Sequence, residues 1–199
     1  AAPVSAEEKQ VGPLDRVYEM DGYNVNTPEE NIFRIEGSSK EFVLLDDEDG
    51  FLVLAKDGYG KRAFDSDGTQ KFDPEDKNNI AYWLNNDFIE SGNGVGNKLP
   101  AEIIKYLEDG HEWFTEGGFP SGNCPKDYSV NCKIALMSQS EWIKYIDKFG
   151  VDDGIGVYGW WLRTARGKNG TTGTVLCSMT TAERIGQTFG QESVNSSQY

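Results

Sequence analysis

The chain has 199 residues, of which 37% are apolar and 12% aromatic, a content that excludes disorder over most of its length and fits one large domain. With 33 acidic and 19 basic residues the net charge is −14, which argues against binding to nucleic acids and to anionic lipid surfaces. No apolar run approaches the roughly 20 residues that a membrane-spanning helix needs.

The amino terminus predicts a lead-in to one domain. Residues 1–14 carry no periodic apolar pattern, and we expect a flexible segment ahead of a single α+β domain over residues 15–199. The small, polar residues at the start fit either what remains after cleavage of a secretory signal or a remnant of cloning.

Short strands come first along the chain. Apolar runs predict strands at 31–35, 42–45 and 51–54, and the last two flank an acidic turn that contains Asp-Gly, which indicates a hairpin. A second hairpin is expected from 61–64 and 70–72, which flank another turn of this kind.

Helices follow in the middle of the chain. Asp73–Pro74 has the composition of a helix start, with Asp as the cap and Pro at the first helical position. A second helix is expected to open at Leu99–Pro100, and a third to run from a cap at Ser138 or Ser140 to Gly150.

The remaining segments alternate between strands and long loops. Period-two apolar patterns predict strands at 133–137, 158–164, 172–180 and 184–189. Loops are expected at 91–98, 115–131 and 150–157, and long loops of this kind often carry function.

Three cysteines are present. Cys124 and Cys132 lie in a polar, turn-rich segment, and a disulfide between them would stabilise it by about 2–3 kcal/mol in a chain-entropy model. The alternative is two free thiols. Cys177 lies in an alternating pattern and is expected to be a buried strand thiol.

Acidic turns supply candidate calcium ligands. Asp46, Asp47 and Asp49 cluster in one turn, and Asp65 and Asp67 in another, and hard cations favour such oxygens. Neither segment matches the EF-hand loop, so solvated acidic turns are the alternative, and calcium is the one cofactor that the sequence suggests.

Catalysis finds little support in the sequence. A catalytic triad would have to use His111, the single histidine, and no Gly-x-Ser-x-Gly segment is present. We expect His111 to be a surface residue near a helix end. Carboxylates are too numerous for any acid–base pair to be singled out, and we assign no catalytic residue.

The most distinctive run is Gly159-Trp-Trp-Leu-Arg163. On a strand Trp160 and Leu162 point to one side, whereas Trp161 and Arg163 point to the other. Arg163 can then stack on Trp161 or pair with a buried carboxylate. The strand is either the centre of the core or a source of ligand contacts through Trp161 and Arg163.

Three motifs in chain order carry a family resemblance. Residues 80–88, 134–145 and 159–163 resemble an uncharacterised bacterial domain family whose members carry WLN..F, LLS..E and WWLRS. The resemblance covers residues 30–199 and implies an extracytoplasmic protein with a C-type-lectin-like fold of short antiparallel strands, two or three helices and long loops, shared with formylglycine-generating and sulfatase-modifying proteins. Thr164 departs from the family's Ser, and a closing VRPA-like strand does not appear before Tyr199.

The favoured function is a non-catalytic binding module of a larger secreted or surface protein, with carbohydrate as the leading ligand. The expected contacts come from aromatic residues and one arginine, namely Trp113, Phe119, Tyr128, Tyr158, Trp161 and Arg163. The alternatives are a protein-interaction, adhesin or scaffold domain, and an enzyme of the formylglycine-generating type that would have to use Cys177. We expect a monomer that binds a glycan or a protein and does not insert into a membrane.

Overall fold

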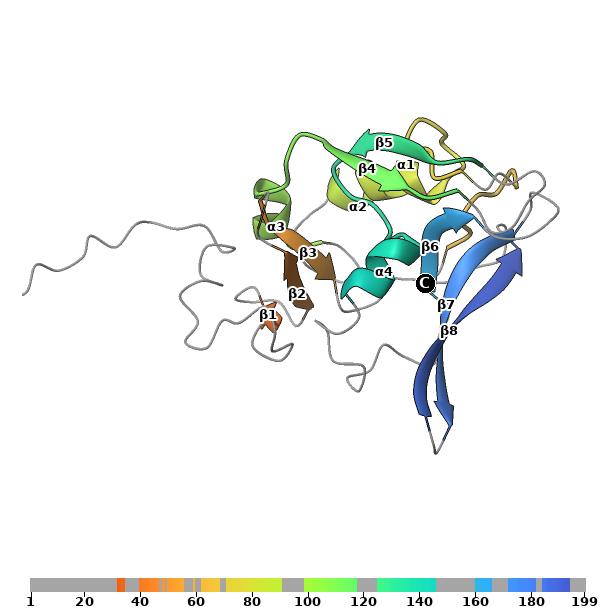
Figure 1. The fold of residues 1–199 in the computed structure, drawn as a ribbon. Helices are drawn as coiled ribbons and strands as arrows, with labels where there is room; N and C mark the ends of the chain where they lie inside the picture. Colours follow the sequence, from red (N-terminus) through yellow and green to blue (C-terminus); the bar gives the residue numbers. More distant parts are fainter. Residues whose placement is uncertain are drawn as a thin grey trace, which may run out of the picture.

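The computed structural model shows an α+β fold built from short antiparallel strands and short helices (Figure 1). The structure describes residues 32–34, 40–46, 48, 50–55, 59, 62–68, 71–90, 99–117, 125–145, 160–165, 172–181 and 184–193. The lead-in expected over residues 1–14 lies outside these residues. The described part contains no helix that is long and apolar enough to cross a bilayer.

The first sheet confirms the hairpin expected near the amino terminus. Strands β1 (Ile32–Arg34), β2 (Glu41–Asp46) and β3 (Leu52–Ala55) pair antiparallel in that order. Leu44 lies opposite Val53, and a bulge follows before the turn.

Strand β2 is buried on both faces, which explains why it is apolar without interruption. Phe42 and Leu44 belong to one hydrophobic cluster, whereas Val43 and Leu45 belong to a second. Each of these four side chains is at most 2% exposed. A strand covered on both sides cannot alternate apolar and polar residues, because either face would bury a polar group.

The described residues include four short helices. They are α1 (Ile80–Asn85), α2 (Asp87–Glu90), α3 (Ala101–Lys105) and α4 (Gln139–Tyr145). The predicted opening of α3 at Leu99–Pro100 is confirmed, since Pro100 is its N-cap residue.

The predicted start of the first helix is wrong. Helix α1 begins at its N-cap Asn79, whose side-chain oxygen accepts a hydrogen bond from the Ala81 N–H at 3.0 Å. The Asp73 carboxylate instead accepts from the Glu75 N–H at 3.0 Å and closes a local turn. Asp-Pro is equally suited to such a turn, so local sequence could not separate the two outcomes.

The second sheet is a hairpin that the sequence does not predict. Strands β4 (His111–Thr115) and β5 (Tyr128–Cys132) pair antiparallel, although we expect residues 115–131 to be a loop. His111 is exposed, which confirms the predicted surface position, but it opens strand β4, so its predicted place near a helix end is wrong.

The third sheet confirms the strands expected near the carboxyl terminus. Strands β6 (Trp160–Ala165), β7 (Thr172–Thr181) and β8 (Arg184–Ser193) are antiparallel in that order. Strand β8 extends past its predicted end at Phe189. In Figure 1, β7 and β8 form a long hairpin beside β6.

The second predicted hairpin is absent from the described part of the segment. Residues 62–64 and 71–72 do not pair with each other; Asp65 instead bridges Asn79, and the Ile80 N–H donates to the Phe64 carbonyl at 2.8 Å. The segment therefore packs against the start of α1 rather than folding on itself.

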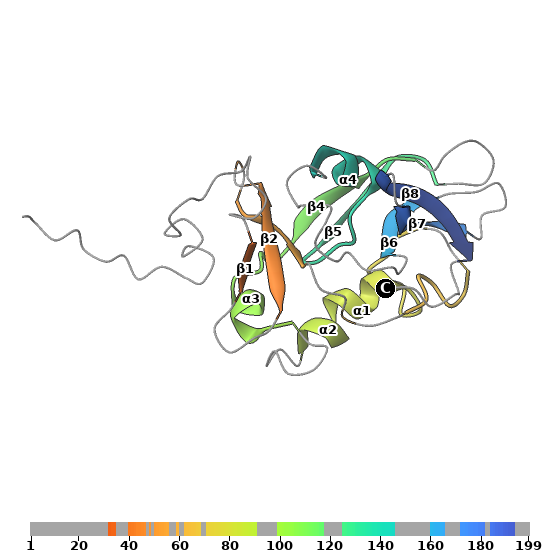
Figure 2. The same cartoon turned by 90° about the horizontal axis from the view of Figure 1, so that it is seen from below.

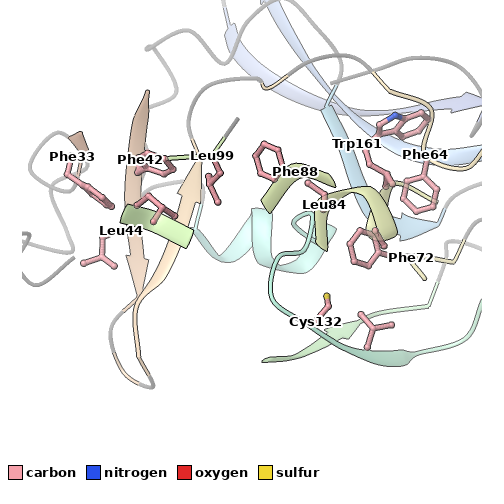
Figure 3. Close-up of a cluster of buried hydrophobic side chains, with 14 residues drawn as sticks. Phe33, Phe42, Leu44, Phe64, Phe72, Leu84, Phe88, Leu99, Cys132 and Trp161 are labelled. Atoms are coloured by element: carbon pink, nitrogen blue, oxygen red, sulfur yellow. The ribbon is translucent and has the colours of Figure 1, made fainter. Parts of the chain in front are cut away.

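The two hydrophobic clusters join the layers. Figure 3 shows the larger cluster, which runs from Phe33 and Phe42 on the first sheet to Trp161 on β6. The smaller cluster places Trp142 of α4 against Leu162 of β6 and the second face of β2. In both Figure 1 and Figure 2, α4 lies beside β6, in agreement with the contacts between them.

Candidate functional site

Arg163 on β6 is a fully buried charge, since it is 0% exposed. Its Nη1 and Nη2 atoms both donate to the Glu141 carboxylate, with Nη1 at 2.6 Å from Oε2. Its Nε donates to the Thr115 hydroxyl at 2.9 Å, its Nη atoms also donate to the carbonyls of Phe114 and Leu136, and its guanidinium lies 5.5 Å from the centre of the Trp113 ring. This is the second of the two roles predicted for Arg163, pairing with a buried carboxylate.

Glu141 is held in place by the start of α4. The Ser138 hydroxyl accepts from the Glu141 N–H at 3.1 Å, and the Glu141 carboxylate accepts from the Ser138 N–H at 2.9 Å. This reciprocal pair is a capping box, and it selects Ser138 over Ser140 as the cap. The same carboxylate therefore caps the start of α4 and balances the charge of Arg163.

Thr164 and Glu116 extend the same polar network. The Thr164 hydroxyl donates to Glu116 Oε1 at 2.6 Å and accepts from the Gln139 N–H at 2.8 Å, while the Ser140 N–H donates to the same Oε1 at 3.0 Å. A serine, as in the family that the motifs resemble, would supply the same hydroxyl, so Thr164 can make the same hydrogen bonds.

Hydrogen bonds lower the pKa of the Glu116 carboxyl. Burial by itself raises this pKa, and the bonds from Thr164, the Glu116 and Ser140 backbone and Ser138 outweigh it. The carboxylate therefore stays charged within the network at neutral pH.

The side chain of Asn85, at the end of α1, forms hydrogen bonds with the backbone of residues 133 and 134. Its side-chain oxygen accepts from the N–H groups of Lys133 and Ile134, both at 2.9 Å, and its amide donates to the Ile134 carbonyl at 2.8 Å. The strand expected over 133–137 is therefore wrong, because a side chain supplies the bonds that a sheet would supply.

Residues of the three motifs thus hold neighbouring segments of the fold together. Asn85 fixes the segment after β5, Glu141 caps α4, and Arg163 joins both to β4 through the contacts above. Strand β6 also follows the predicted alternation, with Trp161 in the larger cluster and Leu162 in the smaller one.

The polar groups of the described ligand-contact candidates form hydrogen bonds within the protein. Trp161 is 2% exposed, and its indole N–H donates to the Arg62 carbonyl at 2.9 Å. The Tyr128 hydroxyl accepts from the Phe72 N–H at 2.9 Å, and burial raises its pKa. Trp113 is half-buried, and its indole N–H donates to the Cys132 carbonyl at 2.9 Å.

Several residues that the sequence singles out cannot be placed, because the structure does not describe them. Phe119, Tyr158, Asp47, Asp49 and Cys124 lie outside the described residues, as do the side chains of Trp160 and Cys177.

The acidic residues that are described accept hydrogen bonds from their own turns and from more distant segments. Asp65 is 0% exposed and accepts from the Gly68 N–H at 2.9 Å and the Asn79 amide at 2.9 Å. Asp67 accepts from the Asn78 amide at 2.6 Å, and Asp46 from the Tyr145 hydroxyl at 2.8 Å. Calcium binding at these turns stays a prediction.

Cys132 is a buried free thiol at the end of β5. Its Sγ donates to the Ile134 carbonyl at 3.4 Å, and burial raises the pKa of the thiol to about 11. Because Cys124 lies outside the described residues, the predicted disulfide stays a prediction.

An apolar cavity of about 250 Å³ lies among the first sheet, the helices α1 to α3, β4 and β6. Its aromatic and aliphatic lining includes Phe42, Trp83, Phe88, Leu99, Ile103 and Trp113. Figure 3 shows four of the lining residues within the larger cluster, with Phe42 and Leu99 toward its first-sheet end and Leu84 and Phe88 nearer its middle. Two predicted contact residues, Trp113 and Trp161, border the cavity.

Arg62 is a cavity residue that the sequence does not single out, and it lies beside Trp83 of the first motif. The Arg62 guanidinium carbon lies 4.0 Å from the centre of the Trp83 ring, which is the distance of a cation–π contact. Burial lowers the pKa of Arg62, and the charge of Asp87 acts in the opposite direction. The local sequence does not predict this contact, because Arg62 lies well before helix α1, which carries Trp83.

Comparisons of the chain with protein family models, with curated proteins and with solved structures find no match. The site must therefore be interpreted from its own residues.

Proposed function

We propose that the chain is a non-catalytic binding domain whose ligand places an apolar group in the cavity beside Trp83 and Trp113. The observation that carries this proposal is the cavity itself, with its volume of about 250 Å³. The cavity is open to solvent on one side and its lining is mainly apolar, so an apolar group that enters it leaves water and gains contacts with the ring and aliphatic side chains.

The occupation of the motif residues supports a binding role over a catalytic one. Arg163, Glu141 and Ser138 bond to one another and to the backbone, and His111 packs its ring against Trp113 at 4.6 Å between centroids. These are the polar groups that sequence analysis would first consider for chemistry. Their contacts build the scaffold around the cavity.

A cavity-filling variant tests this proposal. A neutral apolar probe, 3-phenylpropan-1-ol, is titrated against tryptophan fluorescence of the wild type and of Ala135→Leu, whose side chain enters the cavity lining. We expect saturable binding to the wild type and at least tenfold weaker binding to Ala135→Leu, because the added methyl groups occupy the ligand's space. The matched control is Ala101→Leu, the same change at an exposed helix position. Absence of saturable wild-type binding would overturn the proposal.

Carbohydrate is a second candidate, favoured by one exposed ring. Phe114 on β4 is 55% exposed and faces away from Trp113, since adjacent strand residues point to opposite sides. A sugar face can stack on it. Glycan-array binding that is lost in Phe114→Ala and kept in Ala135→Leu would favour this candidate over the cavity.

The motif resemblance supports a C-type-lectin-like fold and an extracytoplasmic location, which we also propose. In its support, the second motif is bonded to the first through Asn85 and to the third through Arg163, as expected of motifs that define a scaffold. An adhesin or scaffold role is compatible with the same cavity, since the apolar group can belong to a protein. Secretion of the full-length protein, measured by cell fractionation, tests the location.

A further inference from the structure

We infer that the cavity selects small monocarboxylic acids, whose apolar body fills the cavity while the carboxylate pairs with Arg62. The inference rests on the proposed function, since it takes the cavity as the binding site and adds the chemical class of the ligand. It follows from three properties of the cavity: its volume, its apolar lining and the sign of its charged groups.

The volume limits the ligand to one or two rings or a short branched chain. A cavity of 150 Å³ in another protein holds benzene, and cavities for drug-sized ligands begin at about 300 Å³. At about 250 Å³ this cavity falls between the two. An oligosaccharide or a folded peptide does not fit into it.

The lining excludes ligands with several hydroxyl groups. The side chains around the cavity are chiefly Phe, Trp, Leu, Ile and Ala. Each hydroxyl that loses its water without gaining a partner costs about 2–7 kcal/mol. A sugar inside the cavity would leave several such groups unpaired, whereas a ligand with one polar end can keep that end at the border.

The described charged groups that line the cavity have one sign. Among the described residues, the lining contains Arg62 and Lys133 and no aspartate or glutamate, although the charge of Asp87, outside the lining, also acts on Arg62. This is unexpected in a chain with 33 acidic and 19 basic residues. Arg62 is exposed and Lys133 is half-exposed, so both lie where the cavity meets solvent. The local charge is complementary to an anion.

Arg62 is the better placed of the two cations. Its guanidinium lies over Trp83, which restricts its rotation, and the Trp161 indole fixes its backbone carbonyl. Among the described residues, no carboxylate lies within 4.0 Å of it, whereas Lys133 contacts Asp109 at 3.8 Å. A planar guanidinium held in this way can offer two parallel N–H groups to one carboxylate.

Two probes with the same body test the inference. 3-Phenylpropionate and 3-phenylpropan-1-ol differ in the charged end, and both are titrated at low ionic strength against the wild type and three variants. We expect the acid to bind about tenfold more tightly than the alcohol, as charge-assisted hydrogen bonds usually give. Arg62→Gln should remove the difference, and Arg62→Lys should keep part of it. Lys144→Gln, which removes a cation paired with Asp46 away from the cavity, should leave the difference unchanged.

The outcomes separate the two proposals. Equal binding of acid and alcohol by the wild type overturns the carboxylate preference and leaves the binding cavity intact. A preference that persists in Arg62→Gln overturns the role of Arg62. Failure of both probes overturns the proposed function itself. If Arg62→Gln unfolds, Arg62→Lys and loss of the preference at high salt decide the question.

Discussion

Replacing Glu141 with Gln should destabilise the protein more than removing the helix cap that Glu141 shares. In the wild type the carboxylate binds Arg163 through two nitrogens and also accepts from the Ser138 N–H. Glutamine can still accept from the Ser138 N–H, because capping boxes use Gln as well as Glu. The substitution therefore removes the charge from the buried pair and leaves the start of α4 formed.

The magnitude follows from the burial of the two partners. Removing one member of a fully buried ion pair costs about 3–5 kcal/mol, because the other charge stays buried without compensation. Arg163 is 0% exposed, whereas the side chain of Glu141 is 26% exposed. Arg163 also keeps the Thr115 hydroxyl and the Phe114 carbonyl as acceptors. We therefore expect a loss of about 2–3 kcal/mol, below the fully buried range.

Urea unfolding followed by circular dichroism measures this loss. With an m-value of about 2 kcal/mol per molar, a loss of 2–3 kcal/mol lowers the midpoint by about 1–1.5 M. The control Ser138→Ala removes the cap hydroxyl and should cost about 1 kcal/mol. Unchanged m-values would show that both variants unfold as the wild type does.

A second pair of variants checks the coupling. Arg163→Met alone should be strongly destabilised, and adding Glu141→Gln should cost little more, since its partner is already gone. The reasoning is refuted if Glu141→Gln costs no more than Ser138→Ala, because the carbonyl acceptors would then be sufficient for Arg163.

Two further predictions concern the rest of the network. Because folding lowers the pKa of Glu116, its contribution is complete above the unfolded pKa of about 4.3 and is lost as pH falls through the lower folded value. Thr164→Val should therefore reduce stability at pH 7 more than at pH 2, with Thr164→Ser as the conservative control; equal losses at both pH values would contradict this. Asn85→Ala should cost about 2–4 kcal/mol in urea unfolding, since it removes four hydrogen bonds, whereas Asn86→Ala removes one and should cost about 1 kcal/mol; similar losses would show that the bonds to Ile134 contribute little.

The parts of the fold that sequence could predict are those whose pattern is local. Alternation along β6 correctly separates Trp161 from Leu162, and the apolar run of β2 correctly predicts a strand. In both strands the side-chain direction follows from the backbone alone, because the period of two holds whatever the strand packs against. A serine followed by Glu141 three positions later likewise indicates a cap without knowledge of the rest of the chain.

The parts that failed depend on partners distant in sequence. Segment 133–137 has a strand pattern, yet Asn85 supplies its hydrogen bonds from α1. Strands β4 and β5 are each only five residues long and contain both exposed and buried positions. Their apolar residues are therefore too few to show a clear period of two. Their pairing stabilises them, and pairing cannot be deduced from either strand alone.

The cavity was beyond prediction for the same reason, and its relation to the motifs explains how scaffold and site are joined. Trp161 and Arg163 of β6 are buried, and their side-chain nitrogens are hydrogen-bonded within the described part of the chain. Trp161 nevertheless reaches the site, because its indole N–H holds the Arg62 carbonyl while its ring fills the core. A core residue therefore positions the backbone of the cation that we assign to ligand selection. The proposed ligand specificity then depends on Arg62, which precedes the motifs, and on Trp83, which belongs to the first of them, while Asn85, Glu141 and Arg163 hold the surrounding segments in place.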